Sequence, residues 1–238
     1  MRGEEIRGKT IGVLDKGYVR LVDWMGSDLT VVNAARASFM KESHELTERD
    51  VKLIHFLAKH EHTSPFRHCY AQFEVRAPLM VARQWWRHVV GSASVEEGTS
   101  WNEASRRYIT EHLEFYVPRV WRSAPENKKQ GSGGPLPPEV CKKITEGLQR
   151  LIETASETYE KLVAEGVAPE QARLFLPAYA LYVTWRWTAS LHAIVHFLRL
   201  RQSEDAQAEI RQYADAVHEL VKPLWPVSLA AWGLREGW

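Results

Sequence analysis

The sequence predicts an α+β fold, in which a small antiparallel or mixed sheet from the N-terminal half packs with a mostly helical C-terminal half. Two patterns favour this class. The N-terminal half holds β-prone runs around a turn and a period-two stretch, whereas the C-terminal half carries apolar residues at helical spacing. The 238 residues are 45% hydrophobic, which is enough for one packed core, so we expect a single domain over residues 1–238.

The first predicted elements are a hairpin and a helix. Residues 11–24 hold two β-prone runs around a turn at residues 15–17, whose glycine tolerates a positive φ. Thr47-x-x-Asp50 resembles a capping box and precedes apolar residues at helical spacing. We therefore expect a helix that begins there and runs to about His60.

A strand, a loop and a series of helices are expected next. Residues 71–77 alternate apolar and polar side chains, which is typical of a strand with one buried face, and Pro78 suits the first turn of a following helix. Residues 122–138 are rich in glycine and proline and predict a mobile loop. Ser203 is expected to cap the last helix, because two acidic residues follow it. The predicted helices of the C-terminal half cover residues 140–166, 169–176, 185–200 and 204–221.

Composition and charge exclude several classes of protein. Lys and Arg number 31 against 30 Asp and Glu, so a net charge of +1 lacks the field of a general polyanion binder. Cys69 and Cys141 are too few for a disulfide framework or a cysteine-based zinc site, which fits a reducing cytoplasm. Residues 1–5 carry acids where a signal peptide needs an apolar core. Because His192 and His196 break the most apolar later run, we expect a cytoplasmic protein without a membrane span.

A stripe of polar side chains is predicted on the helix after Pro78. Four of them share one face at helical spacing, while the rest of the helix is apolar enough to be buried. They are Arg83, Gln84, Arg87 and His88. Guanidinium groups in a partly desolvated place are costly unless an anion meets them. A ligand with phosphate or carboxylate groups and an internal salt bridge to Glu or Asp are equally weighted interpretations.

Residues 100–108 bring hydroxyl, amide, acid, guanidinium and aromatic groups into nine positions. Such a mixture suits a nucleotide, whose phosphate needs Arg and Ser donors and whose base needs amide partners and an aromatic neighbour. An ordinary polar surface turn is the alternative, and this segment alone leaves both open.

Together these two segments resemble the signature of the flavin-dependent thymidylate synthases. Residues 83–88 read RQWWRH and residues 100–108 read SWNEASRRY, where the family has Arg-His-Arg running into Ser-x-Asn-x-x-Ser-x-Arg. The chain differs within residues 89–99, where it carries eight extra residues and has Val89 in place of the third arginine. Further segments resemble the family and occur in the same order as in the family, two before this signature and two after it. They are residues 14–17, 62–68, 172–177 and 197–201.

The resemblance implies the reductive methylation of dUMP to dTMP, with methylenetetrahydrofolate as the carbon donor and NADPH as the reductant of a bound FAD. It also implies a homotetramer whose active sites lie between subunits. The residues implied to bind dUMP are Gln84, Trp85, Trp86, Arg87, Glu103, Ala104, Ser105, Arg106, Arg107, Arg173 and Arg201. The residues implied to bind FAD are His62, Ser64, Arg87, His88, Glu103, Ser190, His192 and His196.

Arg201 is the catalytic residue that the resemblance implies, because it matches the arginine with which the family favours ionisation of the pyrimidine N3–H. A guanidinium beside the ring stabilises the resulting anion, which makes C5 a better nucleophile. Ser105 is assigned to binding, since no general base stands at a telling position beside it. With the third motif arginine absent, the backbone amides of residues 91–94 or the side chain of Arg106 are expected to meet the phosphates of FAD.

Three other interpretations compete with this one. His60, His62, His68 and Cys69 suggest a metal cluster, but Pro65 interrupts the segment and no carboxylate has a recognised zinc spacing, so we expect no metal. The 10 tryptophans, several near arginines, suggest stacking on single-stranded nucleic acid, against which the net charge near zero weighs. The tryptophans are more simply core or flavin-pocket walls, so we expect no nucleic-acid partner. A flavin-binding homologue without catalysis is separated from an enzyme only by assay.

Overall fold

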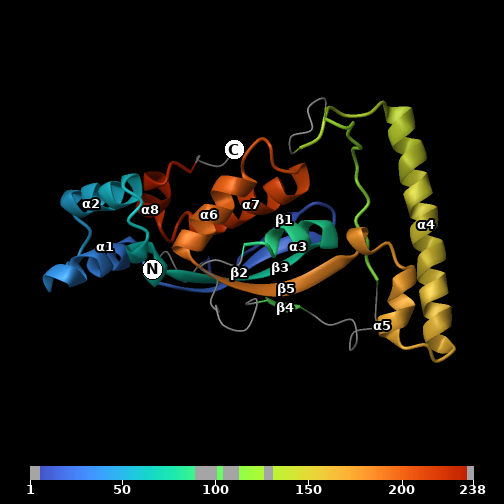
Figure 1. Cartoon of the computed structure of the whole chain (residues 1–238), viewed down its shortest axis with the longest axis horizontal. Helices are drawn as coiled ribbons and strands as arrows, with labels where there is room; N and C mark the ends of the chain where they lie inside the picture. Colours follow the sequence, from blue (N-terminus) through green and yellow to red (C-terminus); the bar gives the residue numbers. More distant parts are fainter. Residues whose placement is uncertain (1–5, 89–100, 104–112, 126–130, 235–238) are drawn as a thin grey trace.

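The computed structural model describes residues 6–88, 101–103, 113–125 and 131–234 (Figure 1). Within these ranges the strands form one antiparallel sheet in the order β1-β2-β3-β5-β4. The strands are β1 (Thr10–Val13), β2 (Gly17–Met25), β3 (Tyr70–Pro78), β4 (Trp101–Glu103) and β5 (Tyr182–Ser190).

The helices lie over one face of this sheet and at its two ends (Figure 1), and with the sheet they confirm the α+β class. The α-helices are α1 (Asp28–Arg36), α2 (Glu48–Lys59), α3 (Leu79–Trp85), α4 (Pro138–Ala164), α5 (Pro169–Ala172), α6 (Leu191–Arg201), α7 (Ala208–Val221) and α8 (Pro226–Ala231). The short 3₁₀ helices are η2 (Ala37–Phe39), η3 (Ser64–His68), η4 (Arg173–Phe175) and η5 (Ala178–Ala180).

The N-terminal hairpin is confirmed, but its glycine is needed for a different reason from the expected one. β1 and β2 pair antiparallel, and the positive φ of the turn falls on Leu14, at 61°, and not on Gly17. A Cβ at Gly17 would clash with the Tyr213 hydroxyl and lie 2.7 Å from the Arg76 carbonyl oxygen. Close packing therefore requires glycine at this position.

β5 is the largest departure from the expected elements. The sequence pattern predicts a helix over residues 185–200, but residues 182–190 form a strand that pairs with β3 along its whole length. Trp185 and Trp187 are buried, and the residues that alternate with them are half-buried. The helical prediction is correct only from Leu191, because aromatic and β-branched residues favour a pleated surface. The sheet thus takes an internal strand from the C-terminal half.

The expected helix boundaries are met in part. The Thr47 hydroxyl accepts a hydrogen bond from the Asp50 N–H and so caps the start of α2, as expected. The helix α4 ends just before Gly166, whose φ is 91°. α5 and η4 together replace the single helix expected over residues 169–176. The cap expected at Ser203 is wrong, because α7 begins at Ala208 and the Ser203 hydroxyl accepts from the N–H of Asp205, at 3.4 Å, which is outside that helix.

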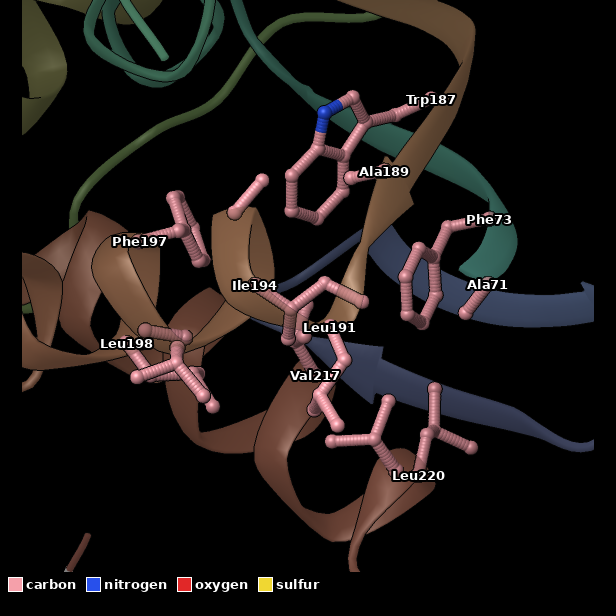
Figure 2. Packing of buried hydrophobic residues seen from close by; sticks show 14 of the residues in the cluster. Ala71, Phe73, Trp187, Ala189, Leu191, Ile194, Phe197, Leu198, Val217 and Leu220 are labelled. Atoms are coloured by element: carbon pink, nitrogen blue, oxygen red, sulfur yellow. The ribbon is translucent and has the colours of Figure 1, made fainter. Parts of the chain in front are cut away.

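The main core lies between the sheet and helices α6 and α7 (Figure 2). Trp85, at the end of α3, enters this core. The centroid of its ring lies 4.4 Å from that of Phe197 on α6 and 5.2 Å from that of Trp187 on β5. This aromatic packing places the end of α3 beside α6.

A second, smaller core joins α4 to α5. Figure 1 shows these two helices together, on the opposite side of the molecule from α1 and α2. The buried residues of this core are Phe115, Tyr159, Ala172, Leu176 and Leu181.

The described parts of the expected loop at residues 122–138 are paired with each other. The Ser123 N–H donates to the Gly134 carbonyl oxygen, and the Gly133 N–H donates to the Ser123 carbonyl oxygen, both at 2.9 Å. Arg122 and Pro135 form an isolated antiparallel bridge. The mobility of this loop stays a prediction.

Asp28 at the start of α1 holds α8. Its Oδ1 accepts from the Ser228 N–H at 2.9 Å and from the Ser228 hydroxyl at 2.5 Å, and its Oδ2 accepts from the Val227 N–H at 2.9 Å. The residue is only 5% exposed. One buried carboxylate therefore caps a helix that begins about 200 residues later in the chain.

Candidate active site

Two distant segments of the chain meet at the last residue of α6. The Arg201 Nε donates to the Nε2 of His88 at 3.0 Å, and the Arg201 Nη2 donates to the carbonyl oxygen of Gln84 at 3.2 Å. Gln84 belongs to α3, and His88 follows that helix directly. One guanidinium thus connects the RQWWRH segment with the C-terminal end of α6.

The predicted polar stripe is only partly correct. α3 ends at Trp85, so the two residues of the stripe that follow it, Arg87 and His88, lie beyond the helix. Arg83 and Arg87 are exposed, whereas His88 is 7% exposed. Water therefore solvates the two stripe arginines, and the partly buried guanidinium of this region is that of Arg201.

The imidazole of His88 is neutral. A guanidinium has no acceptor atom, so the Nε2 of His88 must supply the lone pair in this hydrogen bond. Burial is the largest of the causes that lower the pKa of His88 from 6.5 to about 4, and the positive charge of Arg201 acts in the same direction. Burial also lowers the pKa of Arg201, which still remains charged at neutral pH. The guanidinium of Arg201 thus lies beside a neutral ring, and the charge of Arg87 acts on both groups.

Further imidazoles continue this site along α6. His192 and His196 stand one helical turn apart, and the ring centroids of His196 and His88 are 5.6 Å apart. Burial lowers the pKa of His192, and the charge of Arg67 on η3 lowers it further, so η3 brings a cation to the same face. The Ser190 hydroxyl is 1% exposed and caps α6 by accepting a backbone N–H at 3.2 Å. His192 and His196, not Ser190, therefore present side chains outward.

Ser64 begins η3 and His62 lies two residues before it, and both are exposed. The ring of His62 stacks on that of Phe56 with centroids 6.0 Å apart. Because η3 packs against α6, these two residues border the histidine face of that helix. Their predicted contacts with FAD remain predictions.

Trp85 and Trp86 occupy different environments. Trp85 is fully buried in the main core, so only its backbone is available to a nucleotide. Trp86 is half-buried, and its ring centroid lies 5.9 Å from that of Trp185. Both residues were expected to bind dUMP, and of the two side chains that of Trp86 is the one partly exposed.

Arg173 does not join the group around Arg201. It is exposed on η4, and its Nε donates to the Glu170 carbonyl oxygen at 3.2 Å. Figure 1 shows the adjoining α5 beside α4, away from α6. Glu103 lies on β4, which pairs with β5. The remaining expected contacts, Ala104, Ser105, Arg106, Arg107 and the backbone amides of residues 91–94, lie outside the described residues.

Three residues that were not predicted from the sequence are connected to Gln84 in the structure. The Gln84 Nε2 donates to the side-chain oxygen of Gln207, and the Gln207 Nε2 donates to Glu209 at 2.8 Å. Arg122 donates to both oxygens of Glu209, at 2.7 and 2.8 Å. The sequence could have indicated Glu209, because this acid precedes Ile210 on the apolar face of α7 and a buried acid needs a partner.

The described ranges give no support to a metal cluster or a membrane span. Among these residues, no group of three or more His, Cys, Asp or Glu side chains is placed to hold a metal ion. Burial raises the pKa of the Cys69 thiol to about 12. None of the helices in the described ranges combines the length and apolar character that a bilayer crossing requires.

Known proteins match most of this chain. It is 43% identical over 222 residues to the flavin-dependent thymidylate synthase of Thermus thermophilus, and the match covers 93% of this chain and 77% of that protein. It is 42% identical over 224 residues to the flavin-dependent thymidylate synthase of Anaplasma marginale, with coverage of 93% and 73%. Residues 20–227 match the family described as "Thymidylate synthase complementing protein". The chain belongs to the flavin-dependent thymidylate synthase family.

A solved structure similar to this member of the flavin-dependent thymidylate synthase family is the UMP/dUMP methylase PolB from Streptomyces cacaoi. Its complex with 5-Br UMP has a TM-score of 0.78 and 31% identity, and the match covers 94% of this chain and 96% of that chain. Its complex with 5-Br dUMP has a TM-score of 0.79 and 33% identity. The resemblance on which the site residues were assigned is thereby confirmed at the level of the family.

Proposed function

We propose that this chain is a flavin-dependent thymidylate synthase that methylates dUMP to dTMP, with methylenetetrahydrofolate as the carbon donor and NADPH as the reductant of bound FAD. One observation carries the proposal: His88 and Gln84, both within the motif segment, hold the guanidinium of Arg201. The names of the relatives and the 5-Br dUMP bound to the structural neighbour support this substrate and this chemistry.

Arg201 would act on the pyrimidine. Two hydrogen bonds hold its guanidinium in one plane, and the remaining N–H donors suit an adjacent ring oxygen and nitrogen. A positive charge there favours loss of the N3 proton and raises the electron density at C5. Because His88 is neutral, it orients this cation without competing with it.

The donors beside α6 fit FAD. The imidazoles of His88, His192 and His196 and the guanidinium of Arg67 come from three parts of the chain, and such N–H donors bind diphosphate groups. His62, before η3, would border the cofactor next to these donors. When bound, FAD would supply the redox chemistry of the methylation.

A homotetramer would complete the site. Arg173 is exposed far from Arg201 in the same chain, and its apolar neighbours Leu174 and Phe175 are 82% and 58% exposed. Exposed apolar residues of this size favour coverage by a partner. We propose that another copy of the chain covers this surface and that Arg173 enters the copy's nucleotide site. Sedimentation analysis of the purified protein would test the assembly.

The deciding experiment measures dTMP formation. We expect a yellow protein that converts dUMP to dTMP only when FAD, methylenetetrahydrofolate and NADPH are all supplied. A colourless protein that binds oligonucleotides in a salt-sensitive way, and forms no dTMP, would instead support the nucleic-acid-binding alternative. A yellow protein that binds dUMP but forms no dTMP would instead support the interpretation as a non-catalytic homologue.

A further inference from the structure

The side-chain amide of Gln84 lies at one end of a chain of polar contacts that begins at a buried carboxylate. Glu209 is 3% exposed and receives two hydrogen bonds from Arg122. Gln207 lies between Glu209 and Gln84, and it contacts both through the two ends of its amide. This chain of contacts, from Arg122 to Gln84, connects the start of the 122–138 loop with the motif.

The charge of Glu209 decides the direction of every hydrogen bond in this chain. Burial raises the pKa of Glu209, but hydrogen bonds from Arg122 and Gln207 outweigh burial and hold the pKa below its ordinary value. An ionised carboxylate only accepts hydrogen bonds, so the NH₂ end of Gln207 must face Glu209. The oxygen end of Gln207 then faces Gln84 and can accept only from its NH₂ group.

The orientation of Gln84 follows from this order. Its Nε2 donates to the Gln207 oxygen and to the Met80 carbonyl oxygen at 3.2 Å, which uses both N–H groups. Its Oε1 has no hydrogen-bond partner among the described residues. Gln84 is half-buried, so this oxygen stays available as an acceptor for a ligand.

We propose that Gln207 and Glu209 are positioning residues that turn the side-chain oxygen of Gln84 toward a hydrogen-bond donor of the nucleotide, and that Arg122 maintains this arrangement. The inference rests on the proposed function, in which Gln84 contacts dUMP. Because Arg201 is assigned to N3 of the ring, the donor that dUMP leaves for the oxygen of Gln84 is the 3′-hydroxyl. Neither Gln207 nor Glu209 touches the substrate, and both act through Gln84.

Binding of dUMP to the full chain reconstituted with FAD tests the proposal. Glu209→Gln keeps the shape of the side chain but allows the Gln207 amide to turn over, and Gln207→Leu removes both of its contacts. We expect each variant to raise the Kd for dUMP about tenfold, the effect of one lost hydrogen bond, and to leave the Kd for FAD unchanged. Gln212→Leu and Glu219→Gln, at exposed positions of α7, are matched controls that should bind dUMP as the wild type does.

A double-mutant cycle separates positioning from a general structural role. If Gln207 acts through Gln84, the double variant Gln84→Ala/Gln207→Leu binds dUMP no more weakly than Gln84→Ala alone. The loss should appear in KM with kcat unchanged, and Arg122→Lys should retain more affinity than Arg122→Met. Additive losses in the cycle, or an unchanged Kd in both Gln207→Leu and Glu209→Gln, would overturn the proposal.

The outcomes also separate this inference from the proposed function. A wild-type chain that does not bind dUMP refutes the proposed function, and the inference with it. A wild type that binds dUMP while the cycle is additive refutes the inference alone. If circular dichroism shows that Gln207→Leu does not fold, the isosteric variant Glu209→Gln tests the proposal by itself, and an unchanged Kd for dUMP in that variant would refute it.

Discussion

The Nε of Arg201 lies 3.0 Å from the Nε2 of His88, a residue 113 positions earlier in the chain, and the histidine is the acceptor of this hydrogen bond. The contact defines the charge state of both partners, because the guanidinium can only donate. It also means that the position of the Arg201 side chain, at the end of α6, depends on the RQWWRH segment. Substitutions at either residue therefore probe the site from two sides.

Replacing Arg201 by lysine should abolish most of the dTMP formation while folding and flavin binding persist. Lysine keeps the charge, but one ammonium group cannot reproduce a planar group held at both His88 and Gln84. We expect turnover to fall by about 100-fold or more. Steady-state assays of Arg201→Lys would show this, with circular dichroism and flavin absorbance as controls. Full activity would contradict the assigned role.

His88 should make the fold less stable in acid. Its pKa is 6.5 in an unfolded chain and about 4 in the folded one, so the unfolded chain binds more protons between these values. The free energy of unfolding therefore falls as the pH falls from 6.5 to 4, by at most about 3 kcal/mol for this group.

Urea unfolding at pH 7 and pH 4.5 checks this for the wild type and for His88→Gln. We expect the wild type to lose about 2 kcal/mol more than the variant over that interval. His192 and His218, whose pKa values are also lowered, contribute equally to both proteins and cancel in the difference. Equal losses in the two proteins would show that His88 does not titrate in this way.

Replacing Asp28 by alanine should destabilise the protein by about 2–4 kcal/mol. The change removes the acceptor of both donors of the buried Ser228 and of the N–H of the half-buried Val227. Asp23→Ala is the matched control, because Asp23 is exposed and its ion pair with Arg7 lies on the surface, where it contributes little. Chemical denaturation measures both, and similar costs would argue against a special role for Asp28.

Replacing Gly17 by alanine should cost about 1–3 kcal/mol, because the added methyl group overpacks the contact with Tyr213. Gly12, in the partner strand β1, has no atom within 4 Å of an added Cβ. Gly12→Ala is therefore expected to leave stability unchanged or slightly higher. Melting temperatures of the two variants compare the sites directly, and equal values would refute the close-packing argument.

Part of the candidate site was accessible from the residues alone. The polar stripe singled out Gln84 and His88, the resemblance to the family added Arg201, and the structure brings these three together. It does not bring Arg173 to them, and it encloses the ring of Trp85 in the core. The contacts of Gln207 and Glu209 were not predicted from the sequence, because each residue has a partner from another part of the chain.

The elements that the sequence determined by itself are those stabilised within a few residues. The capping box at Thr47, the long amphipathic α4 and the alternation of β3 depend on local hydrogen bonds and on side-chain periodicity, and all were predicted. β5 was decided by the tertiary structure, because a strand exists only when another strand supplies its hydrogen bonds, and β3 does so from over 100 positions away. The charge of His88 was decided by the tertiary structure for the same reason. Packing against α6, which comes from a distant part of the chain, buries His88 and makes its imidazole neutral.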